Sequence, residues 1–284
     1  MDRPDPEWLD LQYDNRARVP DHAQYFERWA RESAIERERV SRRLHIAYGP
    51  SEAERLDVFP APRLKAPVLV FVHGGWWRSL DKSDFSFLAP CFTREGAMVV
   101  IPNYGLAPAV TLEAMALQLA QALAWTWRHA SLYGGDPQRI VVAGHSAGGH
   151  LAAMLLTCQW RQVGADLPER LLCGGLSISG LFDLEPIRMV PFLRKDLRLT
   201  PDSVERLSPA RLPAPKTPLY ATVGANESEE FIRQNELIRS AWGEDAVPVC
   251  ETIERSNHFD VVDELGDPHG RLHGLAMRLL GLSV

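Results

Sequence analysis

From Ile140 to His150 the sequence reads IVVAGHSAGGH, and these residues carry its clearest indication of a fold. The stretch begins as an apolar run typical of a buried strand, and Gly144, Ser146 and Gly148 then complete the pattern G-x-S-x-G. A strand that turns directly into a helix brings backbones too close for a Cβ, which explains the two glycines. A glycine turn that contains serine by chance is the alternative, but the flanking pattern favours Ser146 as a nucleophile raised on a strained turn. The apolar residues that follow at helical spacing are Leu151, Met154, Leu155 and Cys158.

Outward from this turn, apolar runs alternate with helical segments. Near-continuous apolar runs indicate strands that are covered on both faces. They occur in PVLVFVHGG and AMVVIPNYG, and four further strand candidates are RIVVAGHS, GGLSISG, PLYATVGAN and VPVCETIE. Helical spacing runs over 112–130, and a closing helix is expected over 269–282. The alternation predicts an α/β fold with a mostly parallel central sheet and helices on both faces.

The length of 284 residues fits one large domain, so we expect a single domain over 1–284. Residues 1–45 are expected to form a helical segment that covers the larger body. The segments 45–48 and 55–59 flank a Gly-Pro-Ser turn signal and predict an antiparallel pair at the sheet edge. Residues 186–213 are interrupted by prolines, which predicts a cap-like loop near the strand ends. The apolar residues at helical spacing in the N-terminal segment are Phe26, Trp29, Ala30 and Ala34.

A second glycine loop follows a strand in VFVHGGWW, residues 70–77. Nucleophilic attack on a carbonyl places negative charge on its oxygen, and preorganised backbone N–H groups must meet that charge. Glycines allow a loop to approach the reacting carbonyl closely. We therefore expect an oxyanion hole made by the amides of Gly75, Trp76 and Ala147. Adjacent tryptophans at a strand end wall a pocket or belong to the core, and we assign Trp77 to substrate binding.

The general base is expected in IERSNHFDV, near the end of the chain. The order serine, acid, histidine is that of the α/β-hydrolase fold, so the base follows the last strand, where His258 lies. His269 and His273 compete, but they are four residues apart on the closing helix and fit a surface position. His145 and His150 flank Ser146 too closely in sequence to reach its hydroxyl, and we expect them in packing roles.

The acid that orients the base is expected in the loop of VGANESEEF, which follows the strand PLYATV. Asn226 carries no charge that could stabilise an imidazolium, and Glu229 and Glu230 fall into the following helix, where they are expected to face solvent. Glu227 remains. A glutamate can take the role of an aspartate if its backbone lies farther from the histidine by about the length of one methylene. Asp183, at an earlier strand end, is the reserve candidate.

These motifs together resemble those of a known family. HGGWWRSLDKSDFSFLA, GHSAGGHLA, SGLFDLEP and VGANESEEFIRQ are similar to the corresponding regions of kynurenine formamidases (arylformamidases), which are relatives of the hormone-sensitive-lipase-type esterases. The resemblance covers most of the chain from Tyr48 on. It implies an α/β-hydrolase fold and a cofactor-free serine hydrolase that cleaves N-formylkynurenine or other small aryl formamides and esters. Two positions depart from the family: Glu227 stands where an aspartate is usual, and Trp76 where a tyrosine is frequent.

Composition limits the partners. The net charge of −6 and pI of about 5.9 give no basic surface for nucleic acid or an anionic membrane. The N-terminus has no apolar stretch of signal-peptide length, and no later run approaches a membrane span, so a cytoplasmic protein is expected. Four widely spaced cysteines give no metal-binding pattern, and no metal or cofactor is expected. A homodimer is left open.

Three functions are compatible with these motifs. An arylformamidase-like hydrolase that acts on a small-molecule amide or ester through an acyl-enzyme is the first. A broad short-chain carboxylesterase is the alternative. A non-catalytic ligand-binding protein on a hydrolase scaffold is the remote third, because such proteins usually lack the serine or the histidine and this chain has both.

Overall fold

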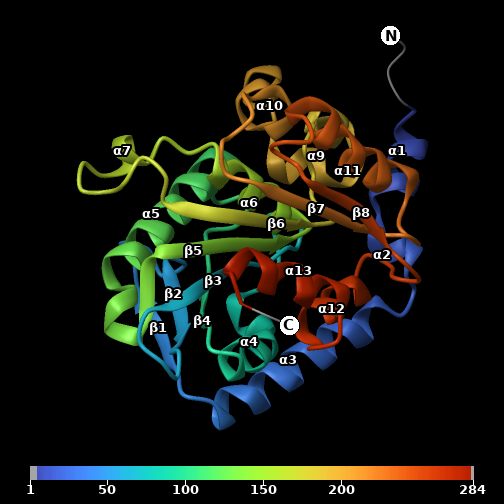
Figure 1. Cartoon of the computed structure of the whole chain (residues 1–284). Helices are drawn as coiled ribbons and strands as arrows, with labels where there is room; N and C mark the ends of the chain where they lie inside the picture. The colour runs from blue at the N-terminus through green and yellow to red at the C-terminus, as the bar shows by residue number, and fades with distance from the viewer. Residues whose placement is uncertain (1–4, 283–284) are drawn as a thin grey trace.

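The computed structural model describes residues 5–282. Within that range an eight-stranded sheet forms the centre, with the order β1-β2-β4-β3-β5-β6-β7-β8 (Figure 1). The strands β1 and β2 pair antiparallel, as do β2 and β4, and the remaining neighbours are parallel. The expected antiparallel pair at the edge is therefore confirmed. The strands are β1 (Arg43–Ala47), β2 (Arg55–Phe59), β3 (Ala66–Val72), β4 (Met98–Pro102), β5 (Gly135–His145), β6 (Leu172–Ile178), β7 (Leu219–Gly224) and β8 (Val249–Ile253).

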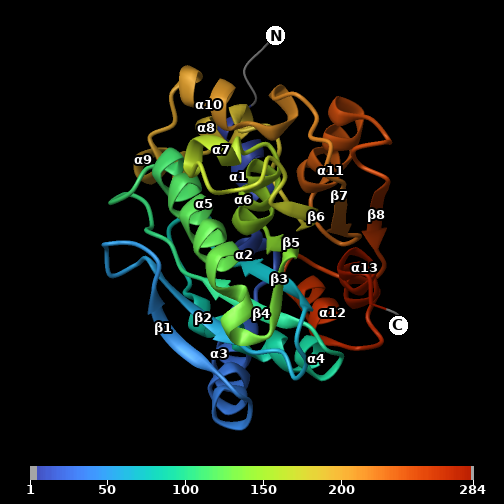
Figure 2. The same cartoon turned by 60° about the vertical axis from the view of Figure 1, so that its left-hand side comes forward.

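Both faces of the sheet are buried, as the strand β3 shows. Val68, Val70 and Val72 point into one hydrophobic core, whereas Leu69 and Phe71 point into the other, because successive side chains of a strand face opposite sides. Each face is covered by helices (Figure 2). On the first lie α5 (Leu112–His129), α6 (Ala147–Leu156) and α11 (Glu229–Trp242); on the second lie α4 (Ala89–Arg94), α12 (Asp263–Gly266) and α13 (Arg271–Leu280). The chain thus has the expected α/β-hydrolase fold, with helices on both faces of a mostly parallel sheet.

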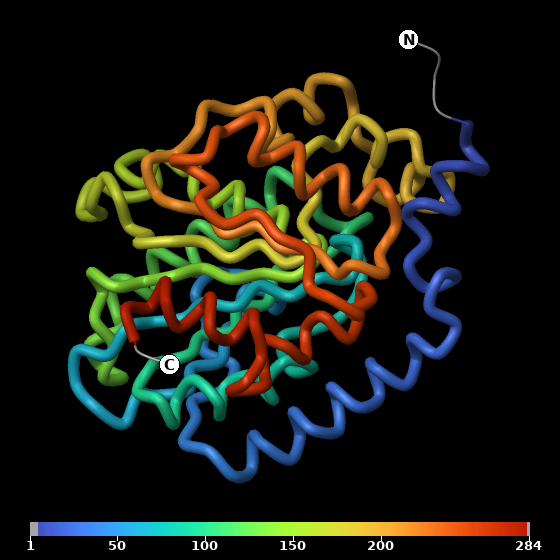
Figure 3. The backbone as a smooth tube through the Cα atoms, turned by 45° about the vertical axis from the view of Figure 1, so that its right-hand side comes forward, coloured from blue at the N-terminus to red at the C-terminus, as the bar shows by residue number. Residues whose placement is uncertain are grey.

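The N-terminal residues form α1 (Pro6–Tyr13), α2 (Asn15–Arg18) and α3 (His22–Arg39), while residues 1–4 of the expected helical segment lie outside the described range. Figure 3 shows this segment running down one side of the body before the chain enters the sheet. The helix α3 packs on the 3-10 helix η1 (Lys82–Leu88), and its Trp29 is fully buried. The charged stretch is therefore held on the body by its apolar face.

Residues 186–213 were expected as a cap-like loop, but most of them fold into short helices. These are α8 (Glu185–Met189), α9 (Pro191–Leu197), α10 (Pro201–Leu207) and the 3-10 helix η3 (Pro209–Arg211). Each carries a proline in its first turn, where the missing N–H would have no partner in any case. The prolines begin helices here and do not merely interrupt the chain.

The remaining short helices join the larger elements. They are η2 (Ala130–Tyr133), α7 (Trp160–Val163) and η4 (Asp260–Val262). In the part of the chain that the structure describes, none of the helices has the length and apolar character needed to cross a membrane.

Candidate active site

Ser146 occupies the single residue between β5, which ends at His145, and α6, which begins at Ala147. Its backbone lies at φ 56° and ψ −119°, a conformation that is strained for a residue with a Cβ. A Cβ added at Gly144 would lie 2.1 Å from the carbonyl oxygen of Gly148, a contact that no real side chain tolerates. The glycines of the motif therefore permit the tight turn that lifts the serine above the sheet.

Ser146, His258 and Glu227 are joined by a chain of hydrogen bonds. The Nε2 atom of His258 lies 3.0 Å from Ser146 Oγ, and its Nδ1 lies 2.6 Å from Glu227 Oε2. The other oxygen of Glu227 accepts hydrogen bonds from the Gly224 amide and the Ser179 hydroxyl. With Glu227 ionised, the histidine donates through Nδ1–H and accepts the serine proton at Nε2. Ser146 is 2% exposed, His258 5% and Glu227 7%. Water therefore screens the contacts between them little.

Two of the other acids considered from the sequence are engaged elsewhere. Asp183, the reserve candidate, lies 3.0 Å from a guanidinium nitrogen of Arg211. Glu230 was expected to face solvent, and this expectation is wrong: it is 6% exposed. The hydroxyl of Tyr13 and the guanidinium of Arg233 both donate to its carboxylate, which makes its burial tolerable.

The loop after β3 holds three consecutive residues at positive φ: Gly75 at 102°, Trp76 at 53° and Trp77 at 56°. A Cβ at Gly75 would lie 2.2 Å from a backbone oxygen, so the glycine is required there. Among residues 5–282, no hydrogen bond engages the amide of Gly75, Trp76 or Ala147. The Ala147 amide is also in the first turn of α6, where backbone N–H groups point out of the helix end. The three amides that we expect to form the oxyanion hole are thus unpaired among the described residues.

His73 anchors the start of this loop. Its ring nitrogens lie 2.9 Å from the Gly74 carbonyl oxygen and 3.1 Å from Asn103 Oδ1. The hydroxyl of Tyr104 donates to the His73 carbonyl, and the two rings stack with centroids 4.5 Å apart. Burial lowers the pKa of His73, so the ring is neutral and serves as a structural support.

A pocket of about 360 Å³ of empty space, its open mouth included, leads to Ser146 and His258. Its aromatic walls are Phe26, Trp29, Trp76 and Phe259. Trp77, to which we assigned substrate contact, is fully buried, with its ring edge-on to His150 at 5.1 Å between centroids. Trp76 is the tryptophan of the pair that lines the pocket.

Sequence reasoning missed the part that the N-terminal segment plays in this pocket. Asn15 and Arg16 of α2 line it together with Phe26 and Trp29 of α3. The helical spacing of the aromatic residues indicated that the segment lies on the body, but local pattern carries no information on which surface it covers. Ser179, which holds the acid, was likewise not singled out, although it lies directly after the strand β6.

The remaining histidines support the site or lie away from it. His145 Nε2 lies 2.8 Å from the backbone oxygen of His258, and His150 Nε2 lies 2.8 Å from a backbone oxygen of α10. Burial lowers the pKa of both, and that of His150 falls to about 4. His269 precedes α13 and is exposed. His273, expected on the surface, is buried because its ring packs on a phenylalanine of α4.

Comparison with known proteins relates this chain to hydrolases. The BD-FAE family model matches residues 56–168. A kynurenine formamidase of Danio rerio is 29% identical over 249 residues, which is 84% of this chain and 82% of the relative. A kynurenine formamidase of Drosophila melanogaster is 28% identical over 78% of this chain and 75% of its own length.

Among solved structures, a proposed thioesterase from Silicibacter sp. TM1040 is similar to this chain with a TM-score of 0.81 and 30% identity. The match covers 93% of this chain and 97% of that one. A thermostable carboxylesterase from a metagenomic library shares the fold, with a TM-score of 0.70 and 19% identity. The chain is thus a kynurenine formamidase-like α/β-hydrolase, related to the esterases of that fold.

Proposed function

We propose that this chain is a serine hydrolase that cleaves a small aryl formamide, such as N-formylkynurenine, through an acyl-enzyme. The observation that carries the proposal is the buried hydrogen-bonded chain Ser146–His258–Glu227 at the turn between β5 and α6. The likeness to relatives named kynurenine formamidase supports the choice of substrate.

In the first half-reaction, Ser146 Oγ attacks the carbonyl carbon while His258 Nε2 takes its proton. The distance of 3.0 Å between these atoms supports direct transfer. Glu227 stabilises the imidazolium that forms and holds the ring in the required tautomer. The negative charge that develops on the carbonyl oxygen is met by the amides of Gly75, Trp76 and Ala147.

His258 then gives its proton to the leaving nitrogen, the carbon–nitrogen bond breaks, and the arylamine departs. A water molecule attacks the acyl-serine while His258 again takes the proton, and the acid is released as Ser146 recovers its hydrogen. The same groups serve both halves of the reaction, so no further catalytic residue is required.

The walls of the pocket favour a small acyl group. Trp76 lies on the oxyanion loop and is 8% exposed, and its ring is packed against those of Tyr13 and Phe231 with centroids 6.2 Å and 6.1 Å away. A bulky ring held this firmly beside the oxyanion hole leaves little room for an acyl chain. A formyl group carries only a hydrogen on its carbonyl carbon and does not need that room. We infer that Trp76 takes the pocket-wall role expected of Trp77.

A short-chain carboxylesterase is the second candidate, because solved relatives are esterases. The two are separated by kcat/KM for N-formylkynurenine and for aryl esters from formyl and acetyl to butyryl. We expect N-formylkynurenine and the formyl ester to be the best substrates, with kcat/KM falling along the series. A maximum at acetyl or butyryl esters with no formamide turnover would favour the esterase. Stoichiometric binding of the formamide without turnover would favour a binding protein.

A further inference from the structure

Glu227 is held by two loops that approach it from different strands. The loop after β6 supplies the Ser179 hydroxyl, and the loop after β7 supplies the Gly224 amide; both donate to the carboxylate oxygen that does not contact His258. The position of the carboxylate therefore depends on how these two loops lie relative to each other. Ser179 is at φ 53°, in the range that a residue with a Cβ rarely adopts, so contacts from outside its loop must hold it there.

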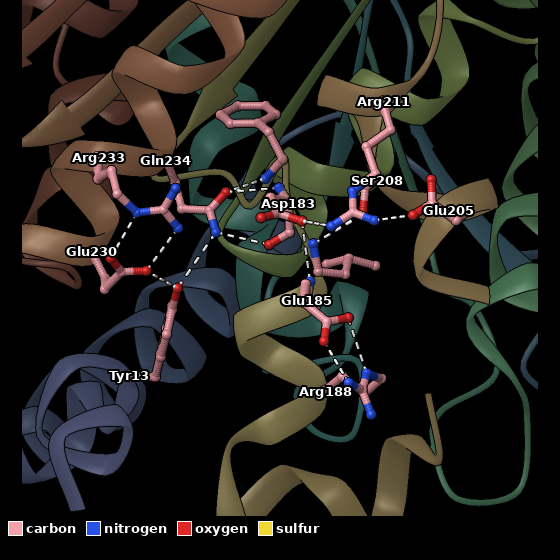
Figure 4. Close-up of polar contacts among 12 residues, drawn as sticks. Tyr13, Asp183, Glu185, Arg188, Glu205, Ser208, Arg211, Glu230, Arg233 and Gln234 are labelled. Carbon is pink, nitrogen blue, oxygen red and sulfur yellow. Dashed lines mark hydrogen bonds and ion pairs between the residues drawn. The ribbon is translucent and has the colours of Figure 1, made fainter. Parts of the chain in front are cut away.

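Gln234 joins the two segments. It lies on α11, the helix that begins two residues after Glu227, and its side chain is fully buried. Its Oε1 accepts hydrogen bonds from the Phe182 and Asp183 amides at 2.7 Å and 2.8 Å, and its Nε2 donates to the Asp183 carbonyl at 2.8 Å (Figure 4). These three bonds link the helix that follows the acid to the segment 179–184, which begins with the serine that binds the acid.

An apolar side chain could not make these contacts. Residues 179–184 form neither helix nor strand, so their amides depend on acceptors outside the segment. Buried N–H groups nearly always have an acceptor, and Gln234 serves two of them at once. Without its amide group, the segment loses the bonds that hold it to α11, and the Ser179 hydroxyl loses its fixed position beside Glu227.

A second set of hydrogen bonds holds Gln234 and α11 in place. The hydroxyl of Tyr13 on α1 donates to Glu230, which also accepts two hydrogen bonds from Arg233. The Nε2 atom of Gln234 lies 3.4 Å from the same hydroxyl oxygen (Figure 4). Burial alone would raise the pKa of Glu230, but the hydrogen bonds from Arg233 and Tyr13 hold it below its usual range, so the carboxylate stays ionised. The network therefore fixes α11 against α1 and, through Tyr13, anchors the adjacent α2.

We propose that Gln234 is a positioning residue for Glu227. By bonding the segment that carries Ser179 to α11, it fixes the place of the carboxylate beside His258. The inference rests on the proposed function, since it concerns the acid of the same site. Gln234 is not among the residues that line the Ser146 pocket, so it acts on the rate of the chemical step and not on substrate binding.

Gln234→Met keeps the approximate size of the side chain but removes its donors and its acceptor. We expect kcat for an aryl ester to fall by about 10–100-fold with KM nearly unchanged, because a displaced carboxylate orients the imidazole less well. Asn235→Leu is the matched control. Asn235 is the neighbouring buried amide on α11, but its Nδ2 donates to the Glu251 carbonyl of β8. This variant should have a lower melting temperature, as Gln234→Met should, yet retain its kcat.

The same change in the Glu227→Gln background separates positioning from a general loss of stability. If Gln234 acts through the carboxylate, Gln234→Met should cost no further activity once the charge is gone. An equal loss in both backgrounds, or an unchanged kcat in the single variant, would overturn the proposal.

If Gln234→Met does not fold, Gln234→Glu takes its place, because a glutamate keeps the acceptor for both amides and loses only the bond to the Asp183 carbonyl. We expect a loss of kcat of about three- to tenfold, the effect of one hydrogen bond, and again no loss in the Glu227→Gln background. An unchanged kcat in this variant would likewise overturn the proposal.

If the wild type turns over neither the aryl ester nor the formamide, the proposed function fails, and the position of Glu227 is measured directly. The short charge-assisted bond between its carboxylate and His258 Nδ1 predicts a proton resonance far downfield, identified by its loss in His258→Gln. This resonance should move upfield or vanish in the folded Gln234 variant and persist in Asn235→Leu. A resonance that is absent from the wild type, or unchanged in the Gln234 variant, would refute the positioning role.

Discussion

Replacing Glu227 by glutamine removes the negative charge beside His258 without changing the size of the side chain. The carboxylate lies 2.6 Å from Nδ1, and both side chains are more than nine-tenths buried. The imidazolium that forms during attack then loses its counter-charge, and a glutamine amide also accommodates the wrong histidine tautomer. We expect kcat to fall by about 10³-fold to 10⁴-fold, or about 4–5 kcal/mol of transition-state stabilisation.

Glu227→Asp tests the geometry and keeps the charge. An aspartate is shorter by about 1.5 Å, one carbon–carbon bond, so the 2.6 Å contact opens to about 4 Å unless the backbone moves. The Gly224 amide and Ser179 hydroxyl that bind the other oxygen resist that movement. We expect a loss of about 10–100-fold, smaller than that of glutamine because the charge remains nearby.

The assay is kcat at saturating substrate for wild type, Glu227→Gln, Glu227→Asp and the control Asp183→Asn. Circular dichroism and thermal melting of each variant exclude a folding defect. We expect Asp183→Asn to retain activity, because Asp183 is bonded to Arg211 and not to His258. A large loss in Asp183→Asn with near-normal turnover in Glu227→Gln would refute the assignment of the acid.

Three further predictions concern stability. Burial lowers the pKa of His150 to about 4 from 6.5, so its neutral form stabilises the fold above pH 6.5. The free energy of unfolding should therefore fall by up to about 3 kcal/mol as pH drops from 6.5 to 4, and His150→Gln should reduce this slope in urea titrations at several pH values. Lys82→Met leaves Asp57, 2.7 Å away and 1% exposed, without its buried partner, and should cost about 3–5 kcal/mol by urea denaturation. Tyr13→Phe removes the hydrogen bond to Glu230 and should cost about 2 kcal/mol, and an unchanged free energy of unfolding would contradict the anchoring of α2.

Much of the site could be predicted from the sequence because its parts are local. The turn at Ser146 needs small residues at fixed positions, and that requirement is visible in the string GHSAG. The strands β3 to β7 are similarly visible as apolar runs, since parallel strands buried on both faces leave no polar alternation. The strand β8 lies at the sheet edge and is only partly buried, so its sequence is more polar. The loop of Glu227 follows from the order of these strands.

Other features depend on contacts between distant segments. Glu230 is buried because Tyr13, more than two hundred positions earlier, reaches it, and nothing near Glu230 in the sequence signals this partner. Asn15 and Arg16 reach the pocket only because α1 and α3 pack on the body around α2. The prolines of residues 186–213 are ambiguous, since a proline fits the first turn of a helix as well as a loop.

The most direct test of the proposed mechanism is to find the residue that carries the acyl group. The protein is reacted with an aryl ester, quenched in acid during turnover and analysed by peptide mass spectrometry, with Ser146→Ala as the comparison. We predict an acyl adduct on Ser146, no adduct at this position in Ser146→Ala, and a loss of kcat by several orders of magnitude in that variant. An adduct on another residue, or near-normal turnover by Ser146→Ala, would contradict the assignment of Ser146 as the nucleophile.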